Sequence, residues 1–412
     1  MSDLNKRDVF IIGAKSIGHY GGYETFVNNL ILHSPKSRGG AAVRYHVAVK
    51  ANGTGCMNEH ELDGVKIISD SEFLFNGVHC FKIHVPAVGA AQAIWYDVTA
   101  INLALRYCRK HHITRPVFYV LACRIGPFIG SLKRRIDRIG GQLFVNPDGH
   151  EWMRAKWSPP VRRYWKYSEG RMVKAADLVI CDSEKMEEYI REEYSRFSPK
   201  TRYISYGADT ARSVIADDDP RFLRWLEAQG VSPGEYYLVV CRFVPENSVE
   251  TIISEFMRSR TSRRLVLIMT QDPHFQRQLQ ERLGYERDGR IRFAGTLYDR
   301  EMLKKVRENA HAYIHGHTVG GTNPGLLEAM ASTEVNLLRD VPFNREVGQD
   351  AALYWNDDEG CLSALIERAD AMPESERTAL GSMAHERIRE AFTWEQAAGQ
   401  YFSLFTEENI RS

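Results

Sequence analysis

The sequence predicts an α/β protein with two domains in tandem. Short apolar runs alternate with segments of helical periodicity along most of the 412 residues, which is the pattern of parallel strands covered by helices. The alternation is interrupted once near the middle and then restarts. Several of the strand-like runs end in glycine-rich loops, as they do in nucleotide-binding α/β domains.

Composition narrows the class of protein. A hydrophobic fraction of 43% is ample for large cores, and a net charge of +1 gives no overall bias toward nucleic acid. No apolar run is long enough for a transmembrane helix, and no signal-peptide pattern precedes the first strand. The seven cysteines are scattered without a CxxC pair, which favours a reducing compartment. We therefore expect a cytoplasmic protein that could still touch the inner membrane surface.

The first half of the chain shows strand and helix patterns in regular succession. Its strand-like runs are Asp8–Ile12, Arg44–Val49, Val65–Ile68, Phe81–Val85, Val117–Leu121, Gln142–Val145 and Leu178–Cys181. Its helix-like segments are Tyr23–Leu32, Ala90–His111, Pro127–Ile139 and a segment through Tyr194, for which Asp182 and Ser183 offer an N-cap.

Residues 210–235 interrupt this succession with an acidic run, two prolines and two glycines. We place the domain linker here, with one domain over 1–210 and the other over 211–391. The alternation then resumes with strands at 236–240, 264–269, 291–293 and 310–314, and with helices at 246–257, 273–283 and 299–309. A last helix is expected over 392–405.

The stretch from His315 to Met330, HGHTVGGTNPGLLEAM, carries the strongest functional signal. Gly320 and Gly321 allow the backbone to approach a ligand closely, and Thr322 follows them. Asn323 suits an N-cap and Pro324 the first helical position. Free N–H groups at such a helix start bind anions, most often phosphate. One turn inside the helix, the carboxylate of Glu328 could accept hydrogen bonds from a sugar hydroxyl.

The glycine loop after the first strand fits neither familiar nucleotide fingerprint. Gly13 and Gly18 have P-loop spacing, but His19 and Tyr20 replace the required Lys and Ser/Thr. The GxGxxG motif is absent, and no acidic residue closes the second strand to hold a ribose. A P-loop NTPase and a dehydrogenase are therefore disfavoured.

Three further groups of polar residues follow strand ends. Asp148 and His150 come after the strand at 142–145, where a His can donate to a sugar hydroxyl. Basic and aromatic residues alternate over 152–167, which suits an anionic headgroup, single-stranded nucleic acid or a solvated helix face. Arg242 follows the strand at 236–240, where it could pair with a diphosphate. His315 and His317 share a face but lack a third metal ligand, so no metal is expected.

Four motifs in this order resemble the retaining GT-B glycosyltransferases of family four, and more narrowly their bacterial polysaccharide rhamnosyltransferase branch. The motifs are YGGYETFVNNL (20–30), NPDGHEWMRAKW (146–157), CRFVPEN (241–247) and VGGTNPGLLEAM (319–330). The resemblance implies two Rossmann-like domains that face each other across a cleft, with nucleotide binding by the C-terminal one. It also implies that the last helix, within 392–412, packs back on the first domain.

The resemblance also implies roles for individual residues of the motifs in the second domain. Glu328 matches the Glu that holds the nucleotide ribose, and Arg242 matches the Arg of an Arg–Lys diphosphate clamp. Gly320 stands where another Glu is usual, and Asn247 stands where the Lys of the clamp is usual. The phosphates would then depend more on the Gly320–Gly321–Thr322–Asn323 backbone.

For the first domain, the resemblance implies contacts to the acceptor and to the transferred sugar. Gly21, Gly22 and Glu24 match the loop that closes over the diphosphate and acceptor, and His150 matches a His beside the transferred sugar. We assign His150, Arg242 and Glu328 as catalytic, and Glu24, Asp148 and Trp152 as acceptor-binding.

The expected reaction is transfer of L-rhamnose from dTDP-L-rhamnose to a lipid-diphosphate-linked saccharide in capsule or cell-wall synthesis. No carboxylate is convincingly placed as a nucleophile, so front-face substitution is favoured. The membrane contact would come from 152–167 and from the helix around Lys133–Arg138. Three alternatives stay open: another UDP- or GDP-sugar donor, a sugar-nucleotide epimerase, and a non-catalytic sugar-nucleotide-binding protein.

Overall fold

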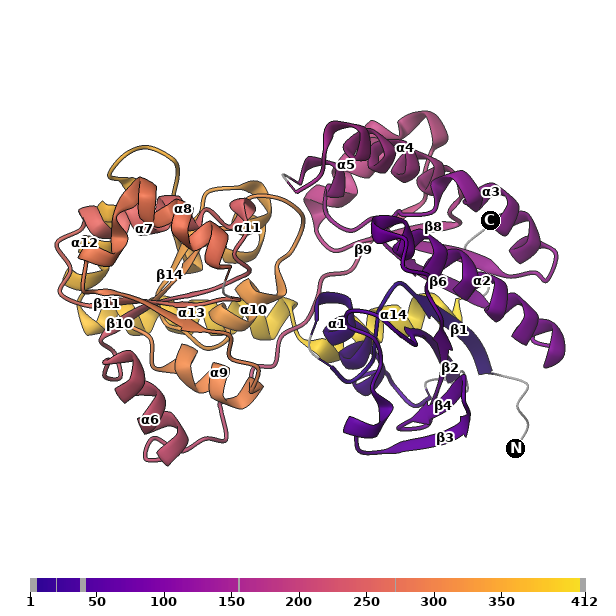
Figure 1. Cartoon of the computed structure of the whole chain (residues 1–412), viewed down its shortest axis with the longest axis horizontal. Coiled ribbons are helices and arrows are strands. Elements are labelled where there is room, and N and C mark those ends of the chain that lie inside the picture. The colour runs from indigo at the N-terminus through magenta and orange to yellow at the C-terminus, as the bar shows by residue number, and fades with distance from the viewer. Residues whose placement is uncertain (1–5, 20, 38–41, 155, 271, 408–412) are drawn as a thin grey trace. The chain divides into compact units, whose positions relative to one another are not determined.

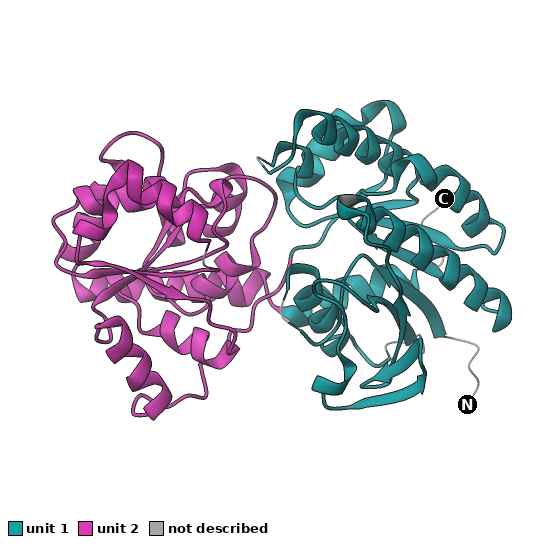
Figure 2. Ribbon diagram, viewed as in Figure 1, with its two compact units in different colours: residues 1–205, 394–412 teal, residues 206–393 magenta. Residues whose placement is uncertain are grey.

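A computed structural model describes residues 6–19, 21–37, 42–154, 156–270 and 272–407. The chain divides into two compact units (Figures 1 and 2): unit 1 comprises Met1–Ser205 with Trp394–Ser412, and unit 2 comprises Tyr206–Thr393. Tyr20 and Ala155, which belong to two of the quoted motifs, lie outside the described residues.

Unit 1 is built on a nine-stranded sheet with the order β3-β4-β5-β2-β1-β6-β7-β8-β9. Only β4 runs antiparallel to its neighbours β3 and β5. The strands are β1 (Lys6–Ile12), β2 (Ala42–Lys50), β3 (Val65–Ser69), β4 (Glu72–Phe75), β5 (Val78–Ile83), β6 (Val117–Leu121), β7 (Gln142–Asn146), β8 (Leu178–Cys181) and β9 (Thr201–Tyr203). The central strands are buried on both faces, which explains their uninterrupted apolar runs.

Helices cover both faces of this sheet. They are α1 (Gly22–Leu32), α2 (Gln92–Lys110), α3 (Gly126–Asp137), α4 (Pro159–Ala175), α5 (Glu184–Glu193) and α14 (Trp394–Thr406). On one face, α2, α3 and Met172 of α4 share a hydrophobic core with β1, β6 and β7. The other core face is formed where α1 and α14 meet, with the rings of Phe26 and Tyr401 5.5 Å apart.

The C-terminal helix packs on unit 1, as predicted. The hydroxyl groups of Tyr401 in α14 and Tyr119 in β6 are 2.9 Å apart, and the Phe405 ring stacks 6.1 Å from Phe144 of β7. The first unit therefore needs a segment that comes after the whole of unit 2.

Unit 2 has a six-stranded, all-parallel sheet with the order β12-β11-β10-β13-β14-β15. Its strands are β10 (Tyr236–Val240), β11 (Arg264–Ile268), β12 (Ile291–Gly295), β13 (Ala312–His315), β14 (Asn336–Arg339) and β15 (Leu353–Trp355). Its helices are α6 (Pro220–Gln229), α7 (Val249–Arg258), α8 (Pro273–Leu283), α9 (Arg300–Glu308), α10 (Pro324–Met330), α11 (Pro342–Gly348), α12 (Cys361–Ala371) and α13 (Glu374–Ala391).

The predicted linker over 210–235 is wrong in one respect, because it contains helix α6. Asp219 caps this helix by accepting from the N–H of Arg221, and Pro220 occupies its start. Phe222 and Leu226 are buried in the core of unit 2. Asp219 and Pro220, which belong to the acidic run and the prolines of this segment, thus act as a helix start signal. Helix α4 and the antiparallel strand β4 were not predicted either.

Both sheets reverse their strand order at one place, and loops converge there. In unit 1 the reversal lies between β1 and β6, and in unit 2 it lies between β10 and β13. Ligands of open α/β sheets bind outside the carboxyl ends of strands at such a point. No helix among the described ranges is long and apolar enough to cross a membrane.

Candidate functional site

In unit 2, the loop from β13 to α10 has the geometry that its sequence predicted. Asn323 caps α10, with its Oδ1 accepting from the N–H of Gly325 at 2.8 Å, and Pro324 occupies the helix start. Gly320 has a φ of +125°, which favours glycine. Because Asn323 uses its side-chain oxygen in the cap, that oxygen is already engaged within the loop.

Glu328 is fixed by a residue that the sequence did not single out. The Nη1 of Arg307 in α9 lies 2.7 Å from the Oε2 of Glu328, and the Glu328 side chain is 42% exposed whereas that of Arg307 is 5% exposed. This ion pair orients the carboxylate, yet leaves it accessible at the surface of unit 2. Spacing could not reveal it, since α9 and α10 are separated by strand β13.

The loop after β10 carries Arg242 and Asn247. Arg242 is exposed, and its guanidinium makes no hydrogen bond or ion pair with the residues that the structure describes. Asn247 is buried: its Nδ2 donates to the carbonyl of Arg242 at 2.7 Å, and its Oδ1 lies 2.9 Å from Nδ1 of His317. Asn247 therefore fixes the backbone that carries Arg242.

A second group of contacts joins the same two loops. The N–H and Oγ1 of Thr318 both donate to the carbonyl of Glu246, at 2.9 and 3.0 Å. A Cβ at Gly316 would come within 2.2 Å of the Asn247 carbonyl, so only glycine allows this approach. These contacts join the loops that follow β10 and β13 into one edge at the reversal point of the sheet.

Two buried polar atoms at this edge have no hydrogen-bond partner among the described residues. They are Oγ1 of Thr322 and Nε2 of His315, whose residues are 3% and 4% exposed. Burial, together with the neighbouring His317, lowers the pKa of His315 to about 3, so its ring is neutral. Such unpaired atoms are costly unless water or a ligand satisfies them.

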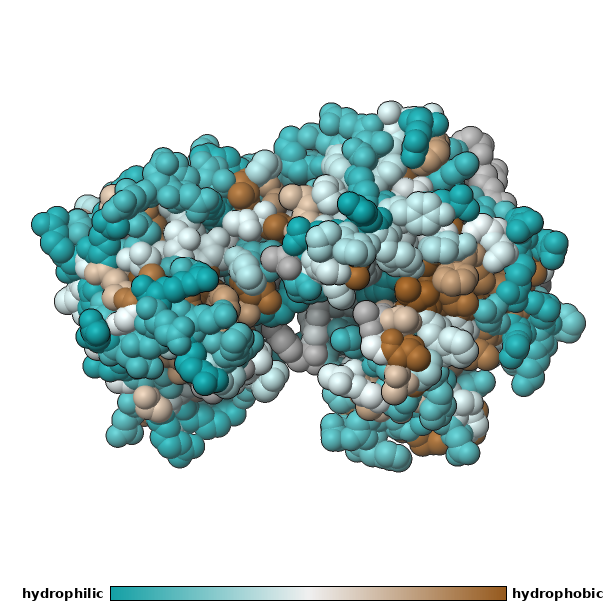
Figure 3. All heavy atoms as spheres, turned by 45° about the horizontal axis from the view of Figure 1, so that its top comes forward, coloured by the Kyte–Doolittle hydropathy of each residue, from teal (hydrophilic) through white to brown (hydrophobic). Residues whose placement is uncertain are grey.

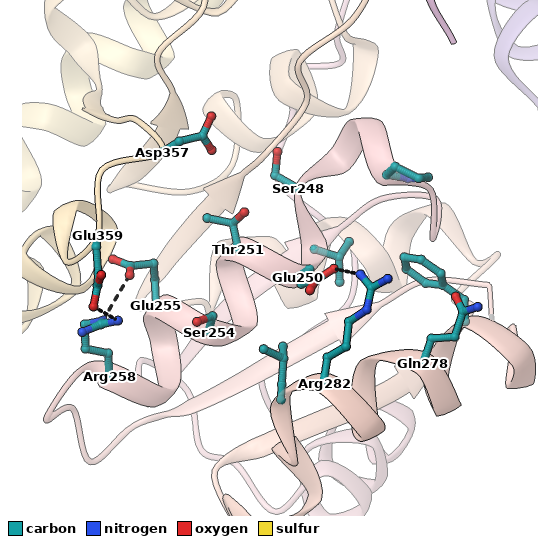
Figure 4. A pocket seen from close by; sticks show the side chains of 14 residues that line it. Ser248, Glu250, Thr251, Ser254, Glu255, Arg258, Gln278, Arg282, Asp357 and Glu359 are labelled. Atoms are coloured by element: carbon teal, nitrogen blue, oxygen red, sulfur yellow. Dashed lines mark hydrogen bonds and ion pairs between the residues drawn. The ribbon is translucent and has the colours of Figure 1, made fainter. Parts of the chain in front are cut away.

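A groove of about 720 Å³ lies beside this edge, between α7, α8 and the loop at Asp357–Glu359 (Figure 4). Its two arginines are engaged in ion pairs, Arg282 with Glu250 at 2.9 Å and Arg258 with Glu359 at 2.6 Å. None of the predicted donor-binding residues lines it. The groove borders the Arg242 loop but is separate from the residues singled out above.

In unit 1, the loop between β1 and α1 is closed by Glu24. The Oε1 of Glu24 accepts from the N–H of Lys15 at 2.7 Å, and a Cβ on Gly21 would lie 2.2 Å from its Oε2. A Cβ on Gly22 would meet nothing within 4 Å, so this glycine leaves open space. Glu24 thus holds the conformation of the glycine loop. This structural role is additional to the acceptor contact that the family resemblance implies.

Arg124 contacts both ends of this loop, and its role was not predicted from the sequence. It follows β6, and its guanidinium donates to both the Gly13 carbonyl at 3.4 Å and Asp97 at 3.3 Å, and lies over the ring of Tyr23. Burial raises the pKa of Asp97 to about 6 although the Arg124 charge opposes the shift. The available signal was an arginine directly after a buried apolar strand.

The loop after β7 holds Asp148 and His150 in a fixed conformation. Asp148 adopts a φ of +60°, and its N–H donates to Oδ1 of Asn146 at 2.7 Å. The His150 ring lies 4.3 Å from that of Tyr189 and 5.7 Å from that of Trp152. Burial, with the nearby charge of Lys166, lowers the pKa of His150, so it is neutral at pH 7.

Lys166 sits among three rings beside His150. Its Nζ is 4.6, 4.9 and 5.2 Å from the ring centres of Trp152, Tyr189 and Tyr194, and 2.8 Å from Glu193. The Nε1 of Trp152 is buried. This ring cluster positions His150 and Trp152 next to each other.

Most basic side chains of the stretch 152–167 form ion pairs within unit 1. Glu151 pairs with Arg154 at 2.5 Å and Lys156 at 2.8 Å, and it accepts from Nε1 of Trp157 at 2.8 Å. Most cations that the predicted membrane contact assigned to this stretch are therefore already paired with carboxylates of the protein.

Among the residues described, no cluster of three or more His, Cys, Asp or Glu side chains could hold a metal ion. The His315 and His317 rings lie 6.1 Å apart. The predicted site residues thus form two groups. In unit 2, Arg242 follows β10, and Gly320, Gly321, Thr322, Asn323 and Glu328 follow β13. In unit 1, Gly21, Gly22 and Glu24 follow β1, and Asp148, His150 and Trp152 follow β7.

The sequence matches one family model, described as "Domain of unknown function (DUF1972)", over residues 6–209. No protein of curated function matches the sequence. The matched segment begins at residue 6 of unit 1 and ends at residue 209, just inside unit 2.

Solved structures resemble the chain over almost its whole length. Sucrose-phosphate synthase from Thermosynechococcus elongatus has a TM-score of 0.73 at 17% identity, covering 97% of this chain and 98% of that one. A structure from E. coli described as trehalose-6-phosphate bound with UDP-2-fluoro glucose has a TM-score of 0.70 at 11% identity, covering 97% and 99%. A glycosyltransferase from Rickettsia africae has a TM-score of 0.69 at 10% identity, covering 97% and 98%. The chain therefore has the GT-B fold, as its motifs predicted.

Proposed function

We propose that the chain is a retaining glycosyltransferase that binds a nucleoside-diphosphate sugar on unit 2 and transfers the sugar to a lipid-diphosphate-linked saccharide. The observation that carries the proposal is the edge of unit 2 where β10 and β13 end. An exposed arginine, the Gly320 turn, the buried Thr322 hydroxyl and a partly exposed, ion-paired glutamate all follow these two strands. The GT-B fold supports it, since a UDP-sugar is bound in one of the similar structures.

The diphosphate and the ribose of the donor each have a chemically suitable residue on unit 2. Arg242 would pair with the diphosphate, and the Gly320, Gly321, Thr322 and Asn323 backbone would donate to it. Glu328, oriented by Arg307, would accept from the ribose hydroxyls. Arg242 would also stabilise the charge that develops on the leaving diphosphate.

On unit 1, we assign the transferred sugar and acceptor to the loops that follow β1 and β7. Neutral His150 would donate a hydrogen bond to the sugar, and Glu24, Asp148 and Trp152 would contact the acceptor. The acceptor hydroxyl would attack on the face from which the diphosphate leaves. The bond between the anomeric carbon and phosphate oxygen breaks, the new glycosidic bond forms, and the hydroxyl proton passes to the departing phosphate oxygen.

The donor that we propose is dTDP-L-rhamnose, and the process is surface polysaccharide synthesis at the cytoplasmic face of the membrane. A donor screen tests this with purified chain, a short lipid-diphosphate glucose acceptor and a panel of sugar nucleotides. Acceptor-dependent nucleotide release from dTDP-L-rhamnose alone supports the proposal. Release from a UDP- or GDP-sugar instead would keep the transferase and discard rhamnose. Donor binding without release would favour a binding protein, and sugar interconversion without acceptor would favour an epimerase.

Variants test the assignments separately. Glu328→Ala should weaken donor binding by roughly 10- to 100-fold, because a hydrogen bond to a charged group contributes about 1.5–3 kcal/mol. Calorimetry measures this without turnover, and near-normal affinity would reject the ribose role. Arg242→Ala should lower kcat by about 100-fold or more, as loss of a transition-state donor does. Arg224→Ala, at an exposed arginine of α6, is the matched control.

A further inference from the structure

Positive charge is concentrated in one part of unit 1. Residues 92–175 contain 16 Lys and Arg but only five Asp and Glu, an excess of 11, whereas the whole chain carries +1. Three of these five acids, Asp97, Glu151 and Glu169, are buried. A fourth, Asp137, pairs with Lys133 at 2.6 Å. The acids of this segment therefore do little to offset its charge at the surface.

Helices α2, α3 and α4 form the outer layer over this part of the sheet (Figure 1), and α3 and α4 lie in close contact. A Cβ on Gly126 would lie 2.5 Å from Cα of Ser168, and one on Gly130 would lie 4.0 Å from Nη2 of Arg171. The two helices thus run side by side in the same direction. Their exposed cations are Arg134, Arg138, Arg163, Arg171 and Lys174.

Large apolar side chains are exposed on the same layer. Trp95 of α2 is 53% exposed, Phe128 of α3 is 47% exposed and Tyr167 of α4 is 55% exposed. Asn102 of α2 and Arg135 of α3 are hydrogen-bonded to each other. Trp95 precedes Asn102 by seven residues and Phe128 precedes Arg135 by seven, so the two rings lie at the same height along their helices. Tyr167 precedes Ser168, which lies against Gly126, and so it lies near that level as well.

We propose that this surface docks unit 1 on an anionic lipid bilayer. The basic–aromatic face, as we call it, consists of the three rings Trp95, Phe128 and Tyr167 and the five cations named above. Aromatic side chains prefer the boundary between headgroups and hydrocarbon, while Lys and Arg pair with anionic headgroups. The face keeps the helix around Lys133–Arg138 but only Arg163 and Tyr167 of the contact expected over 152–167. The Arg154, Lys156 and Lys166 of that stretch are held by internal ion pairs.

A bilayer fits this surface better than a nucleic acid. Val88, just before α2, is 50% exposed and Met153, just before α4, is 48% exposed. These aliphatic side chains cannot stack on bases as single-strand binding requires, but they can enter a lipid interface. On the face of unit 1 that Figure 3 shows, hydrophobic residues (brown) lie among hydrophilic ones.

The inference deepens the proposed function by naming the surface that reaches a lipid-linked acceptor, although it stands on the charge and exposure of unit 1 alone. Co-sedimentation of the full chain with vesicles tests it without donor or acceptor. Vesicles that contain phosphatidylglycerol should bind the chain, and pure phosphatidylcholine vesicles or 0.5 M salt should release it. Equal binding to both vesicle types, or none, would overturn the proposal.

Matched charge reversals locate the surface. Arg138→Glu, Arg163→Glu and Arg171→Glu together should weaken binding by roughly 100-fold or more, since each cation near an anionic surface contributes about a factor of five. Arg224→Glu, Arg277→Glu and Arg287→Glu change the same number of exposed cations on unit 2 and should keep binding. Equal loss in both triple variants would reject the face.

Trp95→Ser with Phe128→Ser separates docking from simple charge attraction. This pair should weaken vesicle binding by at least tenfold while all cations remain, and retention of full binding would overturn the aromatic part of the face. Transfer RNA that displaces the chain from vesicles and binds it more tightly would overturn the lipid assignment. Donor calorimetry on the same samples shows whether the proposed function fails independently.

Discussion

Among the histidines whose pKa is lowered by their surroundings, His150 belongs to the candidate site residues of unit 1 and His315 to the site edge of unit 2. For His150, burial is the larger cause of the lowered pKa and the charge of Lys166 is the smaller. Lys166→Met keeps the stem among the three rings but removes the charge, so the pKa of His150 should rise toward its ordinary value. NMR titration of the His150 ring measures this. Lys174→Met, two turns further along α4, is the matched control, and an equal rise there would contradict the assignment.

The lowered pKa of His315 should make the stability of unit 2 depend on pH. Its pKa is lowered to about 3, so the folded state binds this proton less readily than the unfolded chain. The corresponding stability is present above pH 6.5 and lost as the pH falls, by ~2 kcal/mol between pH 7 and pH 5. Urea unfolding at the two pH values should show that difference between the wild type and His315→Leu. An identical pH dependence in both proteins would contradict it.

At the level of elements, the loops that follow β10 and β13 act as one piece because Asn247 joins them. Asn247→Ala removes its bonds to Arg242 and His317 and should destabilise unit 2 by about 2–3 kcal/mol. Asn247→Lys, which restores the residue usual in the resembling family, should be no better, because the site is 5% exposed. Denaturant unfolding and hydrogen exchange over 242–248 and 316–318 measure both. A fully stable lysine variant would contradict this packing.

The same elements show what could be predicted from the sequence. Buried parallel strands appear as apolar runs, so β6, β8 and β10 were predicted with the bounds that they have. The predicted N-cap Asn323 is confirmed, and of the two candidates Asp182 and Ser183 it is Ser183 that caps α5, because capping is a local interaction.

Interactions between distant elements could not be predicted in this way. Arg307 meets Glu328, and Asn247 meets His317 across 70 positions, through tertiary packing. Helix α4 begins at Pro159–Pro160 and is densely basic and aromatic, which hid its apolar stripe. Their positions after strands suggested ligand contacts for Arg242, Glu328 and His150, the family resemblance specified their roles, and these roles remain predictions.

For the whole molecule, the decisive feature is that unit 1 is discontinuous. Helix α14 buries Trp394, Tyr401, Phe402, Leu404 and Phe405. Burial of a large apolar side chain contributes about 1.5–3 kcal/mol, so the five together contribute on the order of 10 kcal/mol. That is comparable with the entire stability of a typical domain.

Deletion of residues 394–412 should therefore unfold unit 1, although the deletion lies beyond unit 2. Unit 2, which is continuous over 206–393, should stay folded and still bind the donor, since its sheet and its candidate donor residues lie within those limits. Limited proteolysis should leave a resistant fragment that begins near Tyr206, and calorimetry should give it the donor affinity of the full chain. Tyr401→Phe is the mild control, because it removes only the bond to Tyr119 and should cost about 1 kcal/mol. A truncated chain whose unit 1 remains as protease-resistant as in the full protein would show that α14 is dispensable, and would contradict the division of the chain into these two units.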